Sequence, residues 1–336
     1  MTSVAVVGAG SWGTTVAALV AAHAPTTLWV RGAELAATID STHENPQYLP
    51  GVTLPAELRA TASLEAACSG ADVVVMGVPS HGFREVLGDA APFIGADAAV
   101  ISLSKGVEQD TNLRMTEVIA EVLEGHDAGR IGVMSGPNLA REVAAGQPTA
   151  TVVAVRDAAV ADRLQQLFMS PTFRVYTNPD VIGCEIAGAL KNVLAIGAGM
   201  ADGLEYGDNT KAALMTRGLA ELARLGVALG GEPLTFAGLA GMGDLIATCS
   251  SPQSRNRHVG VELGRGRPLD EIVAEMNMVA EGVKTTAAVL HLAAREKVEM
   301  PLAEFVGRVL YEGARPGDLV PELMGRRAKP ELHGIR

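Results

Sequence analysis

The sequence predicts an α/β protein of two domains, a doubly wound parallel sheet flanked by helices and then an all-helical domain. Three observations carry this prediction. Short apolar runs alternate with Ala-rich stretches up to about residue 155, a glycine-rich turn follows the first run, and apolar residues recur at helical spacing beyond residue 180. A chain of 336 residues, 48% hydrophobic and 19% charged, can bury two cores.

The expected strands of the first domain are short, apolar and rich in β-branched residues. Apolar runs without alternation suit strands that are covered on both faces, and a strand–helix rhythm makes neighbouring strands parallel. The predicted strands are residues 4–7, 26–30, 72–78, 99–104, 130–134 and 149–155.

The pattern changes after Asn178-Pro179, where long segments rich in Ala, Leu, Met and Gly begin. We therefore expect domains at 1–180 and 181–330, with a polar tail at 331–336. The predicted helices of the second domain are 181–199, 210–229, 233–240, 254–264, 270–275, 283–296 and 301–311.

Composition narrows the class of protein. The net charge of −11 argues against a general nucleic-acid surface, which needs clustered Lys and Arg. Three scattered cysteines and seven histidines without ligand spacing predict neither a disulfide framework nor a metal site. The N-terminus lacks the pattern of a signal peptide, and charged residues or glycines interrupt each apolar stretch before the roughly 20 residues of a membrane span. We expect a cytoplasmic protein with no integral membrane segment.

The segment GAGSWG, residues 8–13, directly follows the first predicted strand and precedes a helical stretch. Glycines allow a tight turn and close approach of the backbone to a pyrophosphate, and the N–H groups of the new helix face that anion. This context favours a Rossmann-type dinucleotide site over a glycine-rich turn with no ligand.

Arg31 follows the second predicted strand, where an NAD-preferring site usually has Asp or Glu for the ribose hydroxyls. An arginine at this position favours NADP, or tolerance of both cofactors. The alternative interpretation is a solvated side chain that contacts no cofactor. Loops after later strands, GVPS at 77–80 and SKG at 104–106, should line the same crevice, and Lys105 in the second is a candidate ligand for an anion or a substrate oxygen.

Lys191 lies within CEIAGALKNVLAIGAGM, residues 184–200, which reads as a buried helix. A buried lysine is costly unless it is paired or functional, and desolvation moves it toward the neutral form that suits proton exchange with a carbonyl or carbinol oxygen. The other interpretation is a lysine that reaches solvent or pairs with Glu185 or Glu221. Small residues one or two turns away should leave room for a ligand: Ala187, Gly188, Ala195 and Gly199.

A second group of polar residues follows a glycine-rich stretch. GMGDLIAT, residues 241–248, places Asp244 and Thr248 four positions apart, and SRNR, residues 254–257, lies at a predicted helix start. Backbone N–H groups and a guanidinium there suit a phosphate. A capped helix with a solvated basic first turn is the structural alternative, although basic residues oppose the helix dipole at that end.

Eight segments occur in order along nearly the whole chain: GAGSWGT (8–14), SKG (104–106), SGPNLAREVAAGQPTA (135–150), Lys191-Asn192 with IGAGMADGL (196–204), TRGLAELARLG (216–226), GLAGMGDLIATC (238–249), QSRNR (253–257) and EGVKT (281–285). This set resembles the bacterial NAD(P)-dependent sn-glycerol-3-phosphate dehydrogenases. The resemblance implies reversible reduction of dihydroxyacetone phosphate to sn-glycerol 3-phosphate for glycerophospholipid synthesis. It also implies a C-terminal domain of the 6-phosphogluconate-dehydrogenase type.

The resemblance also implies roles for individual residues. Lys191 is the proton donor and acceptor, assisted by Asn192. The cofactor is held by Gly8, Gly10, Ser11, Trp12, Gly13, Arg31, Lys105, Ala140, Arg255, Val279 and Glu281. The substrate is held by Lys105, Gly136, Asn138, Lys191, Asp244, Thr248, Ser254, Arg255 and Asn256. Asn138 departs from the family pattern, since many members carry Ser or Thr at this position.

Two rival functions remain open. A β-hydroxyacid or ketopantoate-type reductase shares the architecture and uses a helix lysine, but acts on carboxylates and does not need the SRNR anion site. A non-catalytic dinucleotide sensor needs no lysine in a cleft of small residues. The resemblance further suggests a homodimer, and helices rich in Ala and Gly could pack closely across its interface.

Overall fold

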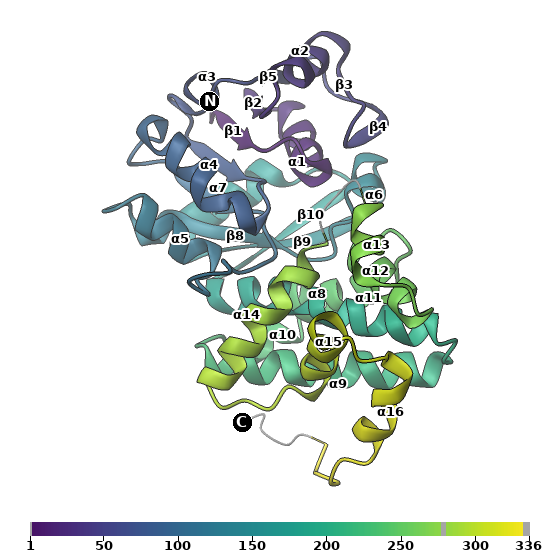
Figure 1. Ribbon diagram of the computed structural model, residues 1–336. Helices are drawn as coiled ribbons and strands as arrows, with labels where there is room; N and C mark the ends of the chain where they lie inside the picture. The colour runs from purple at the N-terminus through teal and green to yellow at the C-terminus, as the bar shows by residue number, and fades with distance from the viewer. Residues whose placement is uncertain (1, 277–279, 332–336) are drawn as a thin grey trace. The chain divides into compact units, whose positions relative to one another are not determined.

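The computed structural model describes residues 2–276 and 280–331, which form two compact units (Figure 1). Unit 1 comprises Met1–Ser104 and Arg114–Val181, and unit 2 comprises Lys105–Leu113 and Ile182–Arg336. The segment Lys105–Leu113, which we expected in the first domain, therefore groups with the helical unit. This assignment places Lys105 among the residues of unit 2.

Unit 1 is built on a sheet with the strand order β10-β9-β8-β7-β6-β1-β2-β5. The central strands are continuous apolar runs that are fully buried, as expected for strands with helices on both faces. The strands are β1 (Val4–Val7), β2 (Thr26–Trp29), β5 (Arg59–Thr61), β6 (Val73–Met76), β7 (Ala99–Ser102), β8 (Ile131–Ser135), β9 (Thr149–Val155) and β10 (Phe173–Asn178).

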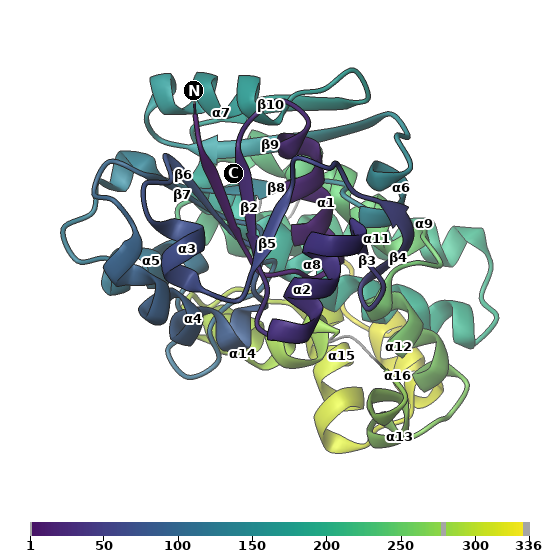
Figure 2. The same ribbon diagram turned by 90° about the horizontal axis from the view of Figure 1, so that it is seen from above.

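Helices cover both faces of this sheet (Figure 2). The helices α1 (Ser11–Ala21) and α7 (Ala158–Phe168) lie on one face, and α3 (Leu64–Cys68), α4 (Phe83–Ala90) and α5 (Met115–Val122) lie on the other. The remaining helical segments of unit 1 are α2 (Ala33–Thr42), α6 (Ala140–Ala144) and three single 3₁₀ turns, η1 (Ser80–Gly82), η2 (Ala91–Phe93) and η3 (Ala128–Arg130). The doubly wound architecture is confirmed.

The expectation of a wholly parallel sheet is wrong at one pair. β8 and β9 run antiparallel, with Gly132 opposite Val155, whereas the other pairs of this sheet are parallel. The reason lies in the connection between them. A parallel crossover usually needs a full helix to return along the sheet, and residues 136–148 contain only the five-residue α6.

Four strands were not anticipated. β3 (Glu44–Asn45) and β4 (Leu49–Thr53) form a separate antiparallel hairpin, while β5 and β10 form the two edges of the main sheet. These segments are short or polar, so they lack the apolar runs by which the central strands were predicted.

The described part of unit 2 from Ile182 on is mainly helical, whereas its segment Lys105–Leu113 is a loop. Its elements are α8 (Val181–Gly203), α9 (Asp208–Ala228), α10 (Pro233–Phe236), the π-helical turn η4 (Leu239–Gly243), α11 (Asp244–Ser250), α12 (Arg255–Gly264), α13 (Leu269–Ala274), α14 (Glu281–Arg295), α15 (Pro301–Glu312) and α16 (Pro316–Met324). The helix expected at 233–240 ends at Phe236 and gives way to η4. α16 was not predicted, because prolines occupy its first position and its interior.

The long helix α8 packs against α12 with unusually close backbones. A Cβ added at Gly199 would lie 2.1 Å from the Arg257 carbonyl oxygen, and one at Gly260 would lie 2.0 Å from the Ile196 carbonyl oxygen. Gly199 of α8 and Gly260 of α12 therefore serve helix–helix packing. The expectation that Gly199 leaves room for a ligand is wrong, since the α12 backbone occupies that space.

α8 is long and apolar enough to cross a membrane by length and composition. Its most apolar window is 94% buried inside the structure, as expected for the core helix of a helical unit.

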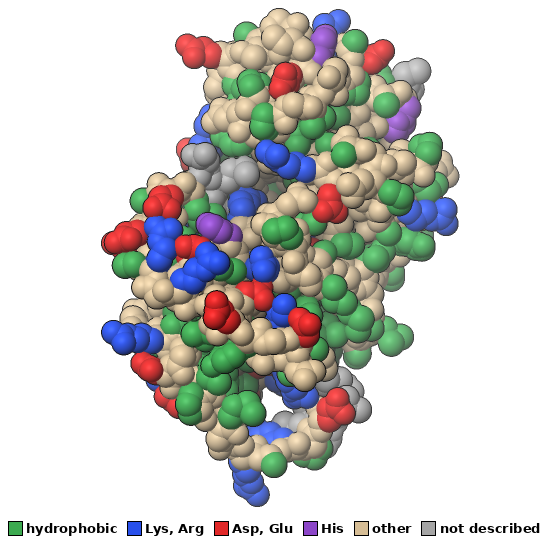
Figure 3. All heavy atoms as spheres, turned by 90° about the vertical axis from the view of Figure 1, so that its right-hand side faces the viewer, with side chains coloured by type: hydrophobic (Ala, Val, Ile, Leu, Met, Phe, Trp, Pro, Cys, Tyr) green, Lys and Arg blue, Asp and Glu red, His purple; other side chains and the backbone are tan. Residues whose placement is uncertain are grey.

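Unit 2 also contains an open cavity of about 1010 Å³. Its walls are mainly apolar side chains of α8, α9 and α15, including Leu194, Leu214, Phe305 and Val306. Figure 3 shows an opening at the lower end of this unit, with hydrophobic and basic side chains around it.

Candidate functional site

The glycine loop between β1 and α1 has a conformation that only glycine allows. Gly8 has φ 117°, and a Cβ there would lie 2.7 Å from the Gly77 carbonyl oxygen. A Cβ at Gly13 would lie 2.0 Å from the Gly8 carbonyl oxygen, so this position fixes close packing of helix and strand. At Gly10, by contrast, a Cβ would meet nothing within 4 Å, so the outer side of the loop is open.

The N-terminus of α1 suits an anion. No side chain caps it, and its first turn contains no acidic residue. Aligned backbone N–H groups therefore present positive potential beside the open face at Gly10. These features fit the pyrophosphate of a dinucleotide.

Ser11 and Trp12 also have structural contacts. The Ser11 hydroxyl donates a hydrogen bond to the Tyr48 carbonyl oxygen at 2.7 Å, and the Trp12 ring lies 6.1 Å from the Phe173 ring. These contacts tie the start of α1 to the β3–β4 hairpin and to β10.

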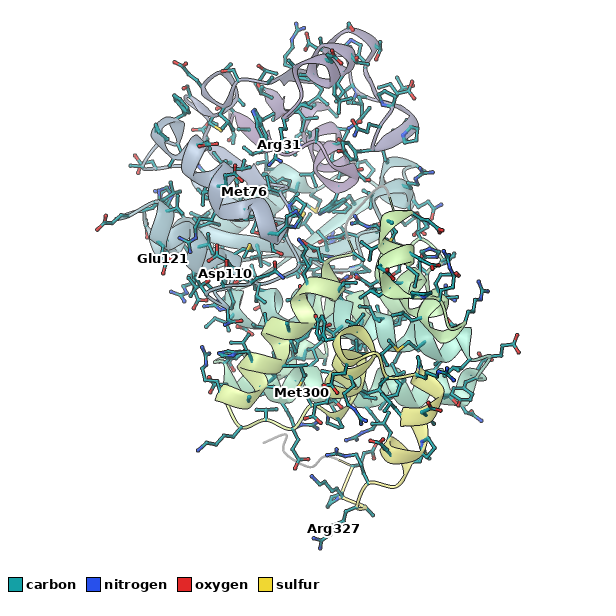
Figure 4. All side chains as sticks on the ribbon, in the orientation of Figure 1. Arg31, Met76, Asp110, Glu121, Met300 and Arg327 are labelled. Atoms are coloured by element: carbon teal, nitrogen blue, oxygen red, sulfur yellow. The ribbon has the colours of Figure 1, made fainter. Side chains whose placement is uncertain are left out.

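Arg31 lies at the carboxyl end of β2 and is exposed. Its Nη2 lies 3.9 Å from the position that a Cβ at Gly82 would occupy, just beyond β6. Figure 4 shows Arg31 at the same end of the sheet as Met76, the last residue of β6. The glycine loop, Arg31 and the 80–82 turn therefore gather at the carboxyl ends of β1, β2 and β6, where open α/β sheets bind ligands.

The loop after β8 contains an unsatisfied acceptor. Gly136 has φ 136°, and Asn138 Nδ2 donates to Thr151 Oγ1 at 3.0 Å. Asn138 Oδ1 is buried without a hydrogen-bond partner among the described residues. Ala140 begins α6, and its carbonyl oxygen accepts from Thr15 Oγ1 at 3.3 Å. A buried acceptor of this kind fits a ligand donor.

In unit 2, Lys191 and Lys105 bind the same carboxylate. Asp244 Oδ1 lies 2.8 Å from Lys191 Nζ, and Asp244 Oδ2 lies 2.7 Å from Lys105 Nζ. Lys191 Nζ also donates to Thr248 Oγ1 at 2.6 Å, and Thr248 Oγ1 donates to Asp244 Oδ1 at 3.2 Å. With both lysines protonated, two positive charges face one negative charge, so the cluster favours an additional anion.

Local structure explains how these residues meet. The Gly243 N–H bonds the Gly238 carbonyl oxygen at 3.1 Å, which closes the π-helical turn η4 before Asp244. A Cβ at Gly241 would lie 2.1 Å from the Phe236 carbonyl oxygen, so this turn requires glycine. Asp244 then begins α11 and Thr248 follows one turn later on the same face. Single-turn π-helices often occur at functional sites.

The pKa of Lys191 is lowered from 10.5 to about 8. Burial is the largest cause, because desolvation penalises the ammonium, and the charge of Lys105 lowers it further. Asp244 acts in the opposite direction through its charge and its hydrogen bond. Lys191 is only 5% exposed, so the cluster holds a proton that can be lost near neutral pH.

Asn192 and Asn256 support the cluster. Asn192 Nδ2 donates to the Lys105 carbonyl oxygen at 2.8 Å, and Asn192 Oδ1 accepts from Asn256 Nδ2 at 2.9 Å. Asn256 Oδ1 accepts from the Gly282 N–H at 2.9 Å. This chain of amides links Lys105 to α8, α12 and α14, so both residues have a structural role in addition to any contact with a ligand.

The start of α12 combines a cap with one exposed guanidinium. Ser254 Oγ accepts from the Arg257 N–H at 3.2 Å, and Arg257 itself pairs with Asp202 at 2.6 Å. Arg255 is exposed as a whole residue, yet burial of its guanidinium lowers the pKa of that group, and the charge of Glu281 at the start of α14 acts in the opposite direction. Arg255 is therefore the basic residue of SRNR that is exposed to a ligand. Val279 lies outside the described residues.

Asp244, the partner of Lys191 in the structure, is not one of the two carboxylates considered from the sequence, Glu185 and Glu221. Asp244 binds Lys191, whereas Glu221 accepts the N–H groups of Leu302 and Ala303 at 2.9 and 3.3 Å. Burial raises the pKa of Glu221 to about 7. The sequence signal for Asp244 was its position after three glycines, four residues before a threonine, but nothing local linked it to Lys191.

Two family models together match most of the chain. Residues 3–161 match the N-terminal model and residues 180–321 the C-terminal model of NAD-dependent glycerol-3-phosphate dehydrogenase. A protein named glycerol-3-phosphate dehydrogenase [NAD(P)+] 2 from Sphingopyxis alaskensis is 59% identical over 330 residues, 98% of each chain. One from Thermobifida fusca, named glycerol-3-phosphate dehydrogenase [NAD(P)+], is 52% identical over the whole length of both chains.

Solved structures agree with this assignment. Glycerol-3-phosphate dehydrogenase from Coxiella burnetii superposes with a TM-score of 0.91 at 38% identity, covering 97% of this chain and 99% of its own. A ketopantoate reductase from Ralstonia eutropha gives a TM-score of 0.58 at 16% identity, covering 92% of this chain and 97% of its own, which shows a shared fold alone. The chain belongs to the NAD-dependent glycerol-3-phosphate dehydrogenase family.

Proposed function

We propose that this protein reversibly reduces dihydroxyacetone phosphate to sn-glycerol 3-phosphate with NAD(P)H. The observation that carries the proposal is the buried cluster in which Asp244 binds both Lys191 and Lys105. The titratable ammonium can exchange a proton with the carbonyl oxygen of the substrate. The surplus of positive charge can stabilise its phosphate.

Unit 1 is the proposed cofactor domain. Bound NAD(P)H supplies the hydride that reaches the carbonyl carbon. Gly8, Gly10, Ser11, Trp12 and Gly13 hold the pyrophosphate against the N-terminus of α1, whose uncapped first turn supports this role. The further cofactor contacts in the proposal are Arg31, Lys105, Ala140, Arg255, Val279 and Glu281.

Lys191 is the proposed proton donor in reduction and acceptor in oxidation. In reduction its Nζ–H proton passes to the carbonyl oxygen, and the nitrogen retains the electron pair. A pKa of about 8 allows both directions near neutral pH. Asp244 and Thr248 orient the ammonium, and Asn192 assists by holding the Lys105 carbonyl.

Unit 2 is the proposed substrate domain. Lys105 and Arg255 supply positive charge for the phosphate, and Ser254 and Asn256 lie in the same helix start as Arg255. Gly136 and Asn138 complete the proposed substrate contacts, and the unsatisfied Asn138 Oδ1 suits a substrate hydroxyl. Phosphate binding away from the reacting carbon fixes its orientation and raises the rate.

Arg31 supports a preference for NADP over NAD. Its exposed guanidinium lies at the carboxyl end of β2, where a 2′-phosphate would be recognised. The proposed location is the cytoplasm, and the proposed product serves glycerophospholipid synthesis.

A homodimer is the proposed assembly. The open cavity of about 1010 Å³ in unit 2 is lined by apolar side chains of α8, α9 and α15; Leu214 of α9 and Phe305 of α15 are half-buried, and Met324 of α16 is 82% exposed. Contiguous exposed apolar surface marks interaction sites. Sedimentation velocity would show a species of twice the chain mass, and a Leu214→Glu variant should dissociate it. A monomeric wild type would exclude the dimer.

Purified protein should oxidise NADPH with dihydroxyacetone phosphate and not with a 2-keto acid such as ketopantoate. The reverse substrate preference would establish the rival reductase. NADPH binding without turnover of either substrate would establish the dinucleotide sensor.

A further inference from the structure

Asn45 is a buried polar residue outside the proposed catalytic and binding residues. It ends β3 and is 0% exposed. Its amide makes three hydrogen bonds within unit 1. Nδ2 donates to the Ala9 carbonyl oxygen at 2.9 Å and to Thr14 Oγ1 at 2.8 Å, and Oδ1 accepts from the Tyr48 N–H at 3.1 Å.

These bonds join the two ends of the glycine loop. Ala9 lies between Gly8 and Gly10, and Thr14 lies in the first turn of α1. The Thr14 hydroxyl also donates to the Ala9 carbonyl oxygen, at 3.2 Å. The Ala9 carbonyl therefore accepts two bonds from one side and is directed toward the β3–β4 hairpin.

The direction of one carbonyl fixes the direction of the next N–H. The peptide bond between Ala9 and Gly10 is planar and trans, so the Gly10 N–H points opposite to the Ala9 carbonyl. That direction is away from Asn45, and a Cβ added at Gly10 would meet no atom within 4 Å. Gly10 is also the N-cap residue of α1, whose start has no side-chain cap and therefore leaves N–H groups for an anion.

We propose that Asn45 is a positioning residue that directs the Gly10 N–H toward the cofactor pyrophosphate. This role rests on the NAD(P) binding proposed above. The hairpin that contains Asn45 therefore serves the glycine loop, because it holds the loop in its ligand-binding conformation before the cofactor arrives. Preorganisation of this kind increases affinity by reducing the cost of ordering the loop.

The test compares Asn45→Ala with Glu44→Ala in the full-length protein. Glu44 Oε1 accepts from the Gly51 N–H at 2.8 Å, so its removal loosens the same hairpin without touching the loop. We expect Asn45→Ala to weaken NADPH binding about tenfold, or ~1.4 kcal/mol. Glu44→Ala should keep the wild-type Kd, and kcat at saturating NADPH should change less than twofold in both variants.

The chemistry of the ligand gives a second measurement. ADP contains the pyrophosphate and adenosine does not, so Asn45→Ala should weaken ADP binding and leave adenosine binding unchanged. Equal losses for both ligands, or equal losses of NADPH affinity in Asn45→Ala and Glu44→Ala, would overturn the positioning role. If Asn45→Ala does not fold, Thr14→Val provides the same comparison with Glu44→Ala, because it removes the Asn45–Thr14 and Thr14–Ala9 hydrogen bonds. Failure of the wild type to bind NADPH would instead refute the proposed function.

Discussion

Replacing Asp244 with asparagine should move the pH dependence of the reaction toward acid. The carboxylate lies 2.8 Å from Lys191 Nζ and raises its pKa, against burial and the charge of Lys105, which lower it. In Asp244→Asn the charge and the charged hydrogen-bond acceptor that raise this pKa most are lost, while both lowering effects remain. The pKa of Lys191 should then fall below its value of about 8 in the wild type.

The geometry sets the size of the effect. Two unit charges 2.8 Å apart interact by about 6 kcal/mol at an effective dielectric constant of about 20. Even a quarter of this, ~1.5 kcal/mol, lowers the pKa by about one unit.

The assay is the pH profile of kcat/KM for reduction of dihydroxyacetone phosphate, followed by the loss of NADPH absorbance. Reduction needs protonated Lys191, so the rate should be constant below the pKa and fall above it. The falling limb should start near pH 8 in the wild type and at least about one unit lower in Asp244→Asn.

The matched control is Asp202→Asn, which removes another aspartate of unit 2, one that pairs with Arg257 and Lys211. It should leave the limb in place. A folded Asp244→Asn protein whose alkaline limb is unchanged, or moves to higher pH, would refute the assignment of that limb to Lys191.

Three further predictions follow from other parts of the structure. Arg31→Ala should lower kcat/KM with NADPH about tenfold, or ~1.4 kcal/mol, and leave kcat/KM with NADH near the wild-type value. The control variant Arg59→Ala should keep the wild-type kcat/KM with both cofactors. An equal fall with both cofactors in Arg31→Ala would count against a 2′-phosphate contact. Gly260→Ala should lower the free energy of unfolding by about 3 kcal/mol, because its Cβ would lie 2.0 Å from the Ile196 carbonyl oxygen. Gly88→Ala is the control and should not destabilise the protein, since its Cβ meets nothing within 4 Å. Similar midpoints of urea unfolding for the two variants would disprove the packing argument. Burial raises the folded-state pKa of Glu221 from 4.5 to about 7, so the fold loses stability progressively as the pH rises from 4.5 to about 7, with the full loss above that range and none below it. Glu221→Gln should therefore gain up to ~3 kcal/mol over the wild type as the pH rises through this window, and a difference independent of pH would contradict the shift.

The central strands of unit 1 were predictable because they are apolar on both faces, and residues such as Val74 and Val75 are fully buried in the structure. The edge strand β5 was not, since Arg59 and Thr61 resemble loop residues. The antiparallel β8–β9 pair also escaped prediction, because apolar runs show where a strand lies and not the direction in which it pairs.

Lys191 was recognisable because it is the one basic residue of a mainly apolar helix. Its partner was not, since Asp244 belongs to a different helix and no sequence pattern shows which carboxylate of another helix lies beside Lys191. The interpretation of Gly199 as space for a ligand was wrong for a similar reason, because its neighbour comes from a different helix. A small residue indicates that something approaches closely, and only the fold shows that the neighbour is the backbone of α12.

The proposed proton transfer by Lys191 is tested most directly by the turnover of Lys191→Ala with NADPH and dihydroxyacetone phosphate. Loss of the general acid should lower kcat by about 10²- to 10⁴-fold, while the Kd for NADPH stays within about twofold of wild type. Lys284→Ala removes an exposed lysine of α14 and should retain full activity. A folded Lys191→Ala protein that keeps more than about a tenth of the wild-type kcat would contradict the account.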